Sequence, residues 1–174
     1  MQIKRIRDWE VYTSLEISLR VCLFVVGTRM PPWIEKGCSE YSKRMPPELS
    51  VKTIEVPLGS RTKSRSPNKA VEIEGETILK LVGRKDFVIA LDVKGKSMCT
   101  TKLADRISEW QMQGKNISFM IGGPDGLSDS CLSRADLRWS ISDLTLPHPL
   151  VRVLLLEQIY RAWTINNNHP YHRK

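Results

Sequence analysis

The side chains best suited to chemistry lie near the carboxyl end of the chain. All three histidines, His148, His169 and His172, fall in its last third. The tail after residue 165 gathers a mixed set of groups: His169, Tyr171, His172, Arg173 and Lys174. An imidazole can move protons near neutral pH, an aromatic ring can stack on a base, and Arg or Lys can bind phosphate. Polar tails are also typical of disordered termini, so composition alone leaves both interpretations open.

A glycine-rich turn follows the apolar stretch of residues 117–121. Its sequence, Gly122-Gly-Pro-Asp-Gly126, places glycines where a strand would end, and glycine lets a backbone approach a ligand closely. The turn is not G-x-G-x-x-G, and no Gly-Lys-Ser/Thr follows it, so it indicates neither a dinucleotide fingerprint nor a Walker loop. Taken alone, it is as typical of a tight turn as of a binding loop.

Two further segments belong beside this turn if the strands are parallel. Leu91 ends the apolar stretch of residues 87–91, and Asp92 follows it, ahead of a predicted turn at residues 94–96. Residues 142–147, Ser-Asp-Leu-Thr-Leu-Pro, follow another predicted strand. In open α/β sheets, ligands bind outside the carboxyl ends of the strands. We therefore expect both segments to border any pocket.

The elements that would position these loops alternate along the chain. Near-continuous apolar runs of strand length predict strands that are buried on both faces. Such strands are expected at residues 19–26, 87–91 and 117–121. Residues 51–56 are a further strand candidate because they are rich in β-branched residues, and a short strand is expected at residues 139–141. Helices are expected from Pro32 to before Pro46, over residues 69–82, from a cap at Thr100 or Thr101 to Gly114, from a cap at Ser128 to about residue 137, and over residues 150–163. This alternation predicts an α/β fold with a mostly parallel sheet and helices on both faces.

The last predicted helix, residues 150–163, is apolar on more than one face. A helix that covers one side of a sheet needs a single apolar stripe. The excess predicts a second buried contact, which is either a dimer interface or burial within the same domain. Arg152, Glu157 and Arg161 are charged residues in this apolar setting. We expect them to pair with each other, a partner chain or a ligand, because burying an unpaired charge is costly.

Size and charge restrict the function further. A chain of 174 residues is expected to form one domain, and its net charge of +8 predicts a polyanionic partner, nucleic acid before an anionic membrane. Residues 59–69 predict a flexible loop that carries Arg61, Lys63, Arg65 and Lys69. These cations either contact a phosphate backbone or belong to a solvated surface loop. Residues 1–17 form an extension of unknown role.

The cysteines indicate neither a metal site nor a disulfide framework. Cys22, Cys38, Cys99 and Cys131 have no C-x-x-C spacing and no histidine nearby in sequence, so we expect free thiols and no metal. The apolar run of residues 21–26 is too short to span a bilayer, and no signal-peptide cleavage site follows it. A cytoplasmic protein without a membrane partner is expected.

Four motifs in order resemble a known family. They are IGGPDG at residues 121–126, LTLPHPLVR at 144–152, YRAW at 160–163 and NHPYHR at 168–173. Over residues 18–174 the chain resembles the large-subunit ribosomal RNA methyltransferase H family, small bacterial members of the SPOUT superfamily of knotted methyltransferases.

The resemblance implies a fold, a reaction and partners that composition cannot show. It implies a single α/β domain over residues 18–174 with a C-terminal trefoil knot, in which the last segment threads through a loop to form the cofactor pocket. It also implies a homodimer that uses S-adenosylmethionine to methylate N3 of a pseudouridine in 23S rRNA. The implied substrate is the assembled ribosome.

The resemblance also assigns site residues. The cofactor pocket is expected from Leu91, Gly123, Ser142, Asp143, Leu144, Thr145, Leu146 and Pro147. Backbone groups of these loops would hold the two ends of the cofactor, and the three leucines would form an apolar slot for adenine. Tyr171, His172 and Arg173 are expected to face the target base from the partner subunit, as catalytic residues.

Methyl transfer from a sulfonium to an imide nitrogen is a direct displacement, so catalysis needs positioning and removal of the N3 proton. His172 is the candidate base, and Arg173 could stabilise negative charge on the ring. Arg152, Tyr171 and solvent are alternatives for the proton. Two rival functions are a non-catalytic ribosome-binding or assembly factor and a nicotinamide-dependent enzyme. The loop motifs disfavour the first, and the missing fingerprint disfavours the second.

Overall fold

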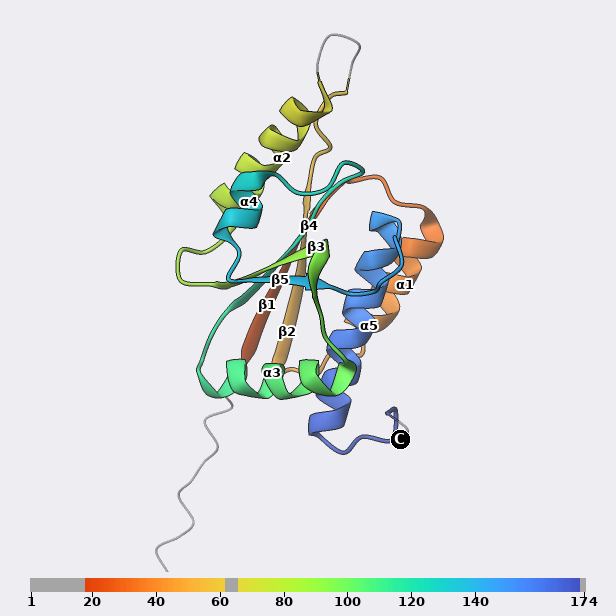
Figure 1. Cartoon of the computed structure of the whole chain (residues 1–174). Coiled ribbons are helices and arrows are strands. Elements are labelled where there is room, and N and C mark those ends of the chain that lie inside the picture. Colours follow the sequence, from red (N-terminus) through yellow and green to blue (C-terminus); the bar gives the residue numbers. More distant parts are fainter. Residues whose placement is uncertain (1–17, 62–65, 173–174) are drawn as a thin grey trace, which may run out of the picture.

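The computed structural model describes residues 18–61 and 66–172 of the chain (Figure 1). In these residues, five strands form one parallel sheet in the order β2-β1-β4-β3-β5. They are β1 (Leu19–Val26), β2 (Leu49–Val56), β3 (Phe87–Ser97), β4 (Ile117–Ile121) and β5 (Leu137–Ser140). The predicted α/β fold with a parallel sheet is confirmed. The extension at residues 1–17 lies outside the described residues.

Helices cover both faces of the sheet, as the apolar strands require. One face carries α1 (Pro32–Ser42), α3 (Thr100–Met112) and α5 (His148–Asn166), and the other carries α2 (Pro67–Leu81) and α4 (Asp129–Arg134). All five residues of the central strand β4 are buried, whereas only the first and last residues of the edge strand β2 are buried. This difference explains why the central strands read as continuous apolar runs.

Helix α5 lies between two neighbours on the larger core. Its side chains Leu155, Leu156, Ile159 and Ala162 pack into the cluster that also holds residues of β1, β3, β4 and α3. Contacts run from α5 to both α1 and α3. Much of the apolar surface of α5 is therefore buried within its own chain, which is one of the two alternatives that its sequence left open.

Strand β3 is longer than its sequence indicates. The predicted turn at residues 94–96 is wrong, because these residues continue β3 to Ser97. Trp139 of β5 pairs first with Leu91 and then with Lys96, so residues 92–95 form a bulge between the two pairings. A Cβ atom on Gly95 would lie 2.6 Å from the carbonyl carbon of Trp139. Only glycine allows this close approach of the two strands.

Several element boundaries differ from expectation. Helix α4 ends at Arg134 rather than near residue 137, because Asp136 exchanges two hydrogen bonds with the backbone of Val88: its N–H donates to the Val88 carbonyl, and its carboxylate accepts the Val88 N–H. This pairing starts β5 at Leu137, two residues before the predicted strand. Cys99, not Thr100 or Thr101, is the residue before α3, and it provides no side-chain cap. Ser128 caps α4 as predicted.

Candidate active site

A cavity of about 770 Å³ opens at the carboxyl ends of β3, β4 and β5. Most of its border comes from four segments: the start of the β3 bulge, the glycine turn after β4, the loop after β5, and the first turn of α5. Parallel strands bring these segments to one edge of the sheet although they are far apart in sequence. Both segments that the sequence places beside the glycine turn border this cavity.

Seven residues that the resemblance assigns to a cofactor line this cavity: Leu91, Gly123, Ser142, Leu144, Thr145, Leu146 and Pro147. Asp143 is exposed and is not among the lining residues. Leu144 is 72% exposed, which leaves a large apolar side chain uncovered at the cavity. An apolar surface of this kind is suited to an aromatic ligand ring.

Two serines fix the loop after β5. The Ser140 hydroxyl donates to the carbonyl of Ser142 at 2.8 Å, and the Ser142 hydroxyl accepts the N–H of Leu144 at 3.0 Å. Hydrogen bonds of this local type hold a turn without regular secondary structure. They set the course of the backbone that carries Leu144 into the cavity wall.

The glycine turn after β4 has no room for larger residues at one position. A Cβ atom on Gly122 would lie 2.4 Å from the carbonyl carbon and oxygen of Gly126. The N–H of Gly126 donates to the carbonyl of Gly123 at 3.1 Å, and Gly126 has a φ of +85°. The turn is therefore a tight backbone loop on the cavity wall, which is the form that close approach to a ligand requires.

Arg152 fixes the amino-terminal part of α5 beneath the cavity. It is 3% exposed and donates to the carbonyls of Val26 and Gly27 at 2.8 and 2.7 Å and to the Glu55 carboxylate at 3.1 Å. Arg152 is paired, but with Glu55 and two backbone carbonyls of its own chain rather than with the expected partners. Its guanidinium is a hydrogen-bond donor here, so it is unsuited to the role of a base.

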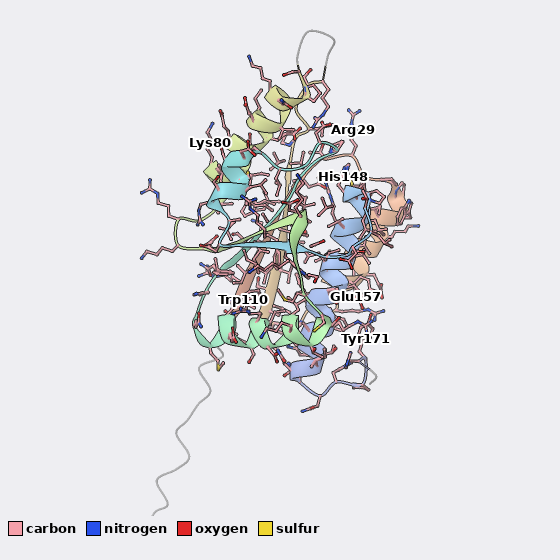
Figure 2. All side chains as sticks on the ribbon, in the orientation of Figure 1. Arg29, Lys80, Trp110, His148, Glu157 and Tyr171 are labelled. Carbon is pink, nitrogen blue, oxygen red and sulfur yellow. The ribbon has the colours of Figure 1, made fainter. Side chains whose placement is uncertain are left out.

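His148 lines the same cavity at the start of α5 (Figure 2). Burial lowers the pKa of His148 below its ordinary value of 6.5, and the cations Arg152 and Arg61 lower this pKa further. The ring is therefore neutral at pH 7. A neutral imidazole offers one donor and one acceptor nitrogen at the cavity wall.

The tail folds back on the other end of α5 (Figure 2). The Tyr171 hydroxyl donates to Glu157 at 3.1 Å, and its ring lies edge-on to Tyr160 with centroids 4.9 Å apart. Arg161 stands 4.8 Å from the Tyr171 ring and donates to Glu157 at 2.7 Å. The predicted pairing of Glu157 and Arg161 is confirmed.

Burial, followed by the Tyr41 hydroxyl and the Glu157 carboxylate, raises the pKa of Tyr171. Its phenol is protonated at neutral pH and acts as a donor. His172 is half-buried, and its Nδ1 atom is buried without a partner among the described residues. Arg173 lies outside the described residues.

In the basic loop, which was expected to contact phosphate or solvent, Arg61 instead pairs with carboxylates of the same chain. Its guanidinium is engaged by two carboxylates, Glu74 and Asp125, both at 2.7 Å. Lys69 lies in the first turn of α2, and Lys63 and Arg65 lie outside the described residues. Arg61 is therefore a paired residue rather than a free cation of the loop.

Known proteins similar to this chain decide its family. A family model described as "Predicted SPOUT methyltransferase" matches residues 19–172. A protein of Saccharophagus degradans named "Ribosomal RNA large subunit methyltransferase H" is 53% identical over 155 residues, which cover 89% of this chain and 100% of that protein. A protein of Hahella chejuensis with the same name is 51% identical over 156 residues, 90% of this chain and 100% of the relative.

The chain belongs to the SPOUT methyltransferase family. The resemblance inferred from the four motifs is thus confirmed. The span that matches the SPOUT methyltransferase model contains every residue that lines the cavity, and it also contains Tyr171 and His172. It leaves out residues 1–17.

Other features of this SPOUT methyltransferase concern metals and membranes. Within residues 18–61 and 66–172, no group of three His, Cys, Asp or Glu side chains is arranged to hold a metal ion. No helix in that part of the chain is long and apolar enough to cross a bilayer. The four cysteines are free.

Sequence reasoning missed Glu74, which is 2% exposed and lies behind the glycine turn. Only one signal could have indicated it. Glu74 is spaced four residues from Ala70 and from Ile78, both of which face the core, so it shares their side of α2. An acidic residue on the buried side of a helix requires a partner.

Proposed function

We propose that this protein is an S-adenosylmethionine-dependent methyltransferase of large-subunit ribosomal RNA. Its target is N3 of a pseudouridine in 23S rRNA of the assembled ribosome, and it acts in the cytoplasm as a homodimer. The observation that carries the proposal is the cavity, which gathers at one edge of the sheet seven residues that the resemblance assigns to the cofactor. The full-length similarity to proteins named ribosomal RNA large subunit methyltransferase H supports the RNA substrate.

The cavity suits a nucleoside cofactor with an amino-acid end. Its volume of about 770 Å³ lies within the range of pockets for such ligands. Leu91, Leu144 and Leu146 would hold the adenine, and the backbone of Gly123 would approach the ligand. When bound, S-adenosylmethionine supplies an electrophilic methyl group on a sulfonium.

The position of the tail supports a dimeric active site. The cavity lies at the first turn of α5, whereas Tyr171 packs beside Glu157 and Tyr160. From Val151 to Tyr160 the helix axis rises about 14 Å. The tail of one chain is thus directed away from the cavity of that chain, and a second copy would bring a tail to it.

An interface on α5 would also account for the rest of its apolar surface. Leu150, Val153 and Leu154 are only half-buried in the single chain. Helix faces of this kind are typical of interfaces between copies.

We also propose that residues 18–174 form one domain with a C-terminal trefoil knot. The arrangement of the last elements supports this proposal. After the edge strand β5, the chain returns across the sheet so that α5 lies between α1 and α3. Threading of the last segment would place the loop after β5 against the glycine turn, and both border the cavity.

In this proposal the residues of the chain position the base and handle one proton. The hydroxyl of Tyr171 donates to Glu157, so Tyr171 would offer its ring to the base for stacking. His172, with an unpartnered Nδ1, is the candidate acceptor of the N3 proton, with solvent as the alternative. Arg173 would stabilise the negative charge that develops on the uracil ring after the proton leaves.

The decisive experiment uses ribosomes that lack the modification. They are incubated with the protein and S-adenosylmethionine, and methylated nucleotides are located by mass mapping of the 23S rRNA. A methyl group on N3 of one pseudouridine supports the proposal, and free 23S rRNA serves as the comparison substrate. A non-catalytic assembly factor would bind ribosomes but would show no heat of binding with S-adenosylmethionine and no methyl transfer.

A further inference from the structure

A buried carboxylate lies directly behind the glycine turn of the cavity. Glu74 of α2 is 2% exposed, and its Oε1 atom accepts the N–H of Gly59 and a guanidinium N–H of Arg61, each at 2.7 Å. Its Oε2 atom is 3.5 Å from the position that a Cβ atom on Gly123 would take. Burial of a carboxylate is tolerated only with such partners, so Glu74 requires Arg61.

Arg61 joins this carboxylate to the glycine turn itself. Its Nε atom donates to Asp125 at 2.7 Å, while its NH1 atom donates to Glu74 and to the carbonyl of Gly59. Asp125 belongs to the turn at residues 122–126 and is separated from Arg61 by 64 positions. The arginine therefore connects three segments: the stretch after β2, helix α2 and the cavity wall.

We infer that Arg61 is a positioning residue that holds the glycine turn in its ligand-ready form, acting through Asp125 and anchored on Glu74. The inference rests on the proposed function, because it takes the cavity to be the S-adenosylmethionine site. A turn of three glycines and one proline has few side chains to fix it, and Arg61 is the partner of Asp125 among the described residues. Preorganisation of such a turn favours binding by lowering the ordering cost.

The alternative role for Arg61 is a phosphate contact, which its place in the basic loop suggests. The two roles differ in what they change. Loss of a phosphate contact weakens binding to RNA and lowers the salt slope of that binding by about one unit. Loss of a positioning residue weakens binding of the cofactor and leaves the salt slope of RNA binding unchanged.

The test is a double-mutant cycle on Arg61→Gln and Asp125→Asn. Affinity for S-adenosylmethionine is measured by calorimetry, KM and kcat by methyl transfer, and ribosome binding at several salt concentrations. Each single variant is expected to lower the affinity for S-adenosylmethionine about tenfold, which is the effect of losing a charge-assisted hydrogen bond. Each is also expected to raise KM more than it lowers kcat. The double variant is expected to bind S-adenosylmethionine no more weakly than the weaker of the two single variants, because each substitution removes the same link.

Two controls keep the test interpretable. Arg106→Gln removes the same charge and an exposed ion pair with Glu109 on α3, and it should leave cofactor affinity unchanged. Asp125→Asn leaves the pair between Arg61 and Glu74 in place, so it tests the link even if Arg61→Gln fails to fold.

Three outcomes would overturn the inference. Wild-type affinity in Asp125→Asn would show that the link does not position the turn. Additive losses in the double variant would show that Arg61 does not act through Asp125. A salt slope lowered only in Arg61→Gln, with unchanged cofactor affinity, would assign Arg61 to phosphate. In each case the proposed function stands, whereas failure of the wild-type protein to bind S-adenosylmethionine removes the proposed function and the inference together.

Discussion

The two ends of α5 are built in opposite ways. At its amino-terminal end, Arg152 is 3% exposed and bound to three acceptors from β1, β2 and the turn after β1. At its carboxyl-terminal end, Arg161 is 30% exposed and shares Glu157 with the tail residue Tyr171. The first end borders the cavity, which Val151 and His148 help to line. The second end carries the tail residues Tyr171 and His172, which do not line the cavity. Under the proposed function, the cofactor would bind within one copy, whereas catalysis would need two.

Removal of the tail should separate the two ends most sharply. We expect a chain that stops after Asn168 to bind S-adenosylmethionine within about twofold of the full chain, because no residue beyond 151 lines the cavity. Methylation should fall at least about a hundredfold, since the groups that are proposed to face the base are gone. Calorimetry measures the first quantity and methyl transfer to ribosomes measures the second. Methylation that survives the truncation would exclude the tail from catalysis.

Two arginine substitutions should show that the ends also differ in stability. Arg152→Met leaves the carbonyls of Val26 and Gly27 without donors and should cost about 3–5 kcal/mol of unfolding free energy. The matched change Arg161→Met removes a partly exposed pair and should cost about 0.2–1 kcal/mol. Chemical denaturation of both variants gives the comparison. Equal losses would mean that the two ends are held alike.

The glycine turn offers a smaller change confined to the cavity end. Gly122→Ala places a methyl group against the backbone of Gly126, and overpacking of this kind costs about 1–3 kcal/mol. We expect the cost to appear as weaker binding of S-adenosylmethionine, with ribosome binding unchanged. Gly114→Asn is the control, because a Cβ atom there meets nothing within 4 Å and asparagine tolerates its φ of +61°. Normal cofactor affinity in Gly122→Ala would show that the turn does not contact the ligand.

How far the sequence predicted this structure depends on where each hydrogen-bond partner lies. Strands β1 and β4 are apolar because both faces are covered, so their sequence predicts them directly. The end of α4 and the second half of β3 are set by distant partners, Val88 and Trp139, and local propensity cannot show them. The predicted turn at residues 94–96 had the right residue types, yet pairing with β5 decides its conformation.

The same distinction holds at the site. Seven residues of the cavity wall could be placed from the resemblance together with the rule that ligands bind at the carboxyl ends of parallel strands. Arg61 could not be placed, because its partners lie 13 and 64 positions away and only the tertiary fold brings them together. Its sequence context, a loop of cations and small residues, favours a free cation and not a buried link.

His148 provides the mildest test of the contrast, through pH. Burial, Arg152 and Arg61 lower the pKa of His148 below 6.5, so the folded protein holds this proton less tightly than the unfolded chain does. Between the lowered pKa and 6.5 the unfolded chain binds more protons, and the free energy of unfolding rises with pH. The contribution is fully present above 6.5 and is lost as the pH falls from 6.5 towards the lowered pKa.

His148→Gln should therefore flatten the pH dependence of stability below about pH 6.5, measured as the midpoint of urea unfolding at several pH values. The matched variant His169→Gln removes an exposed histidine near the tail end of α5 instead. If the slope of the wild-type protein persists in His148→Gln and is lost in His169→Gln, the buried histidine at the cavity is not its source. A slope that is flattened only in His148→Gln would show that protonation of His148 causes the pH dependence. Arg152 of α5 and Arg61, which supports the glycine turn, both disfavour that protonation.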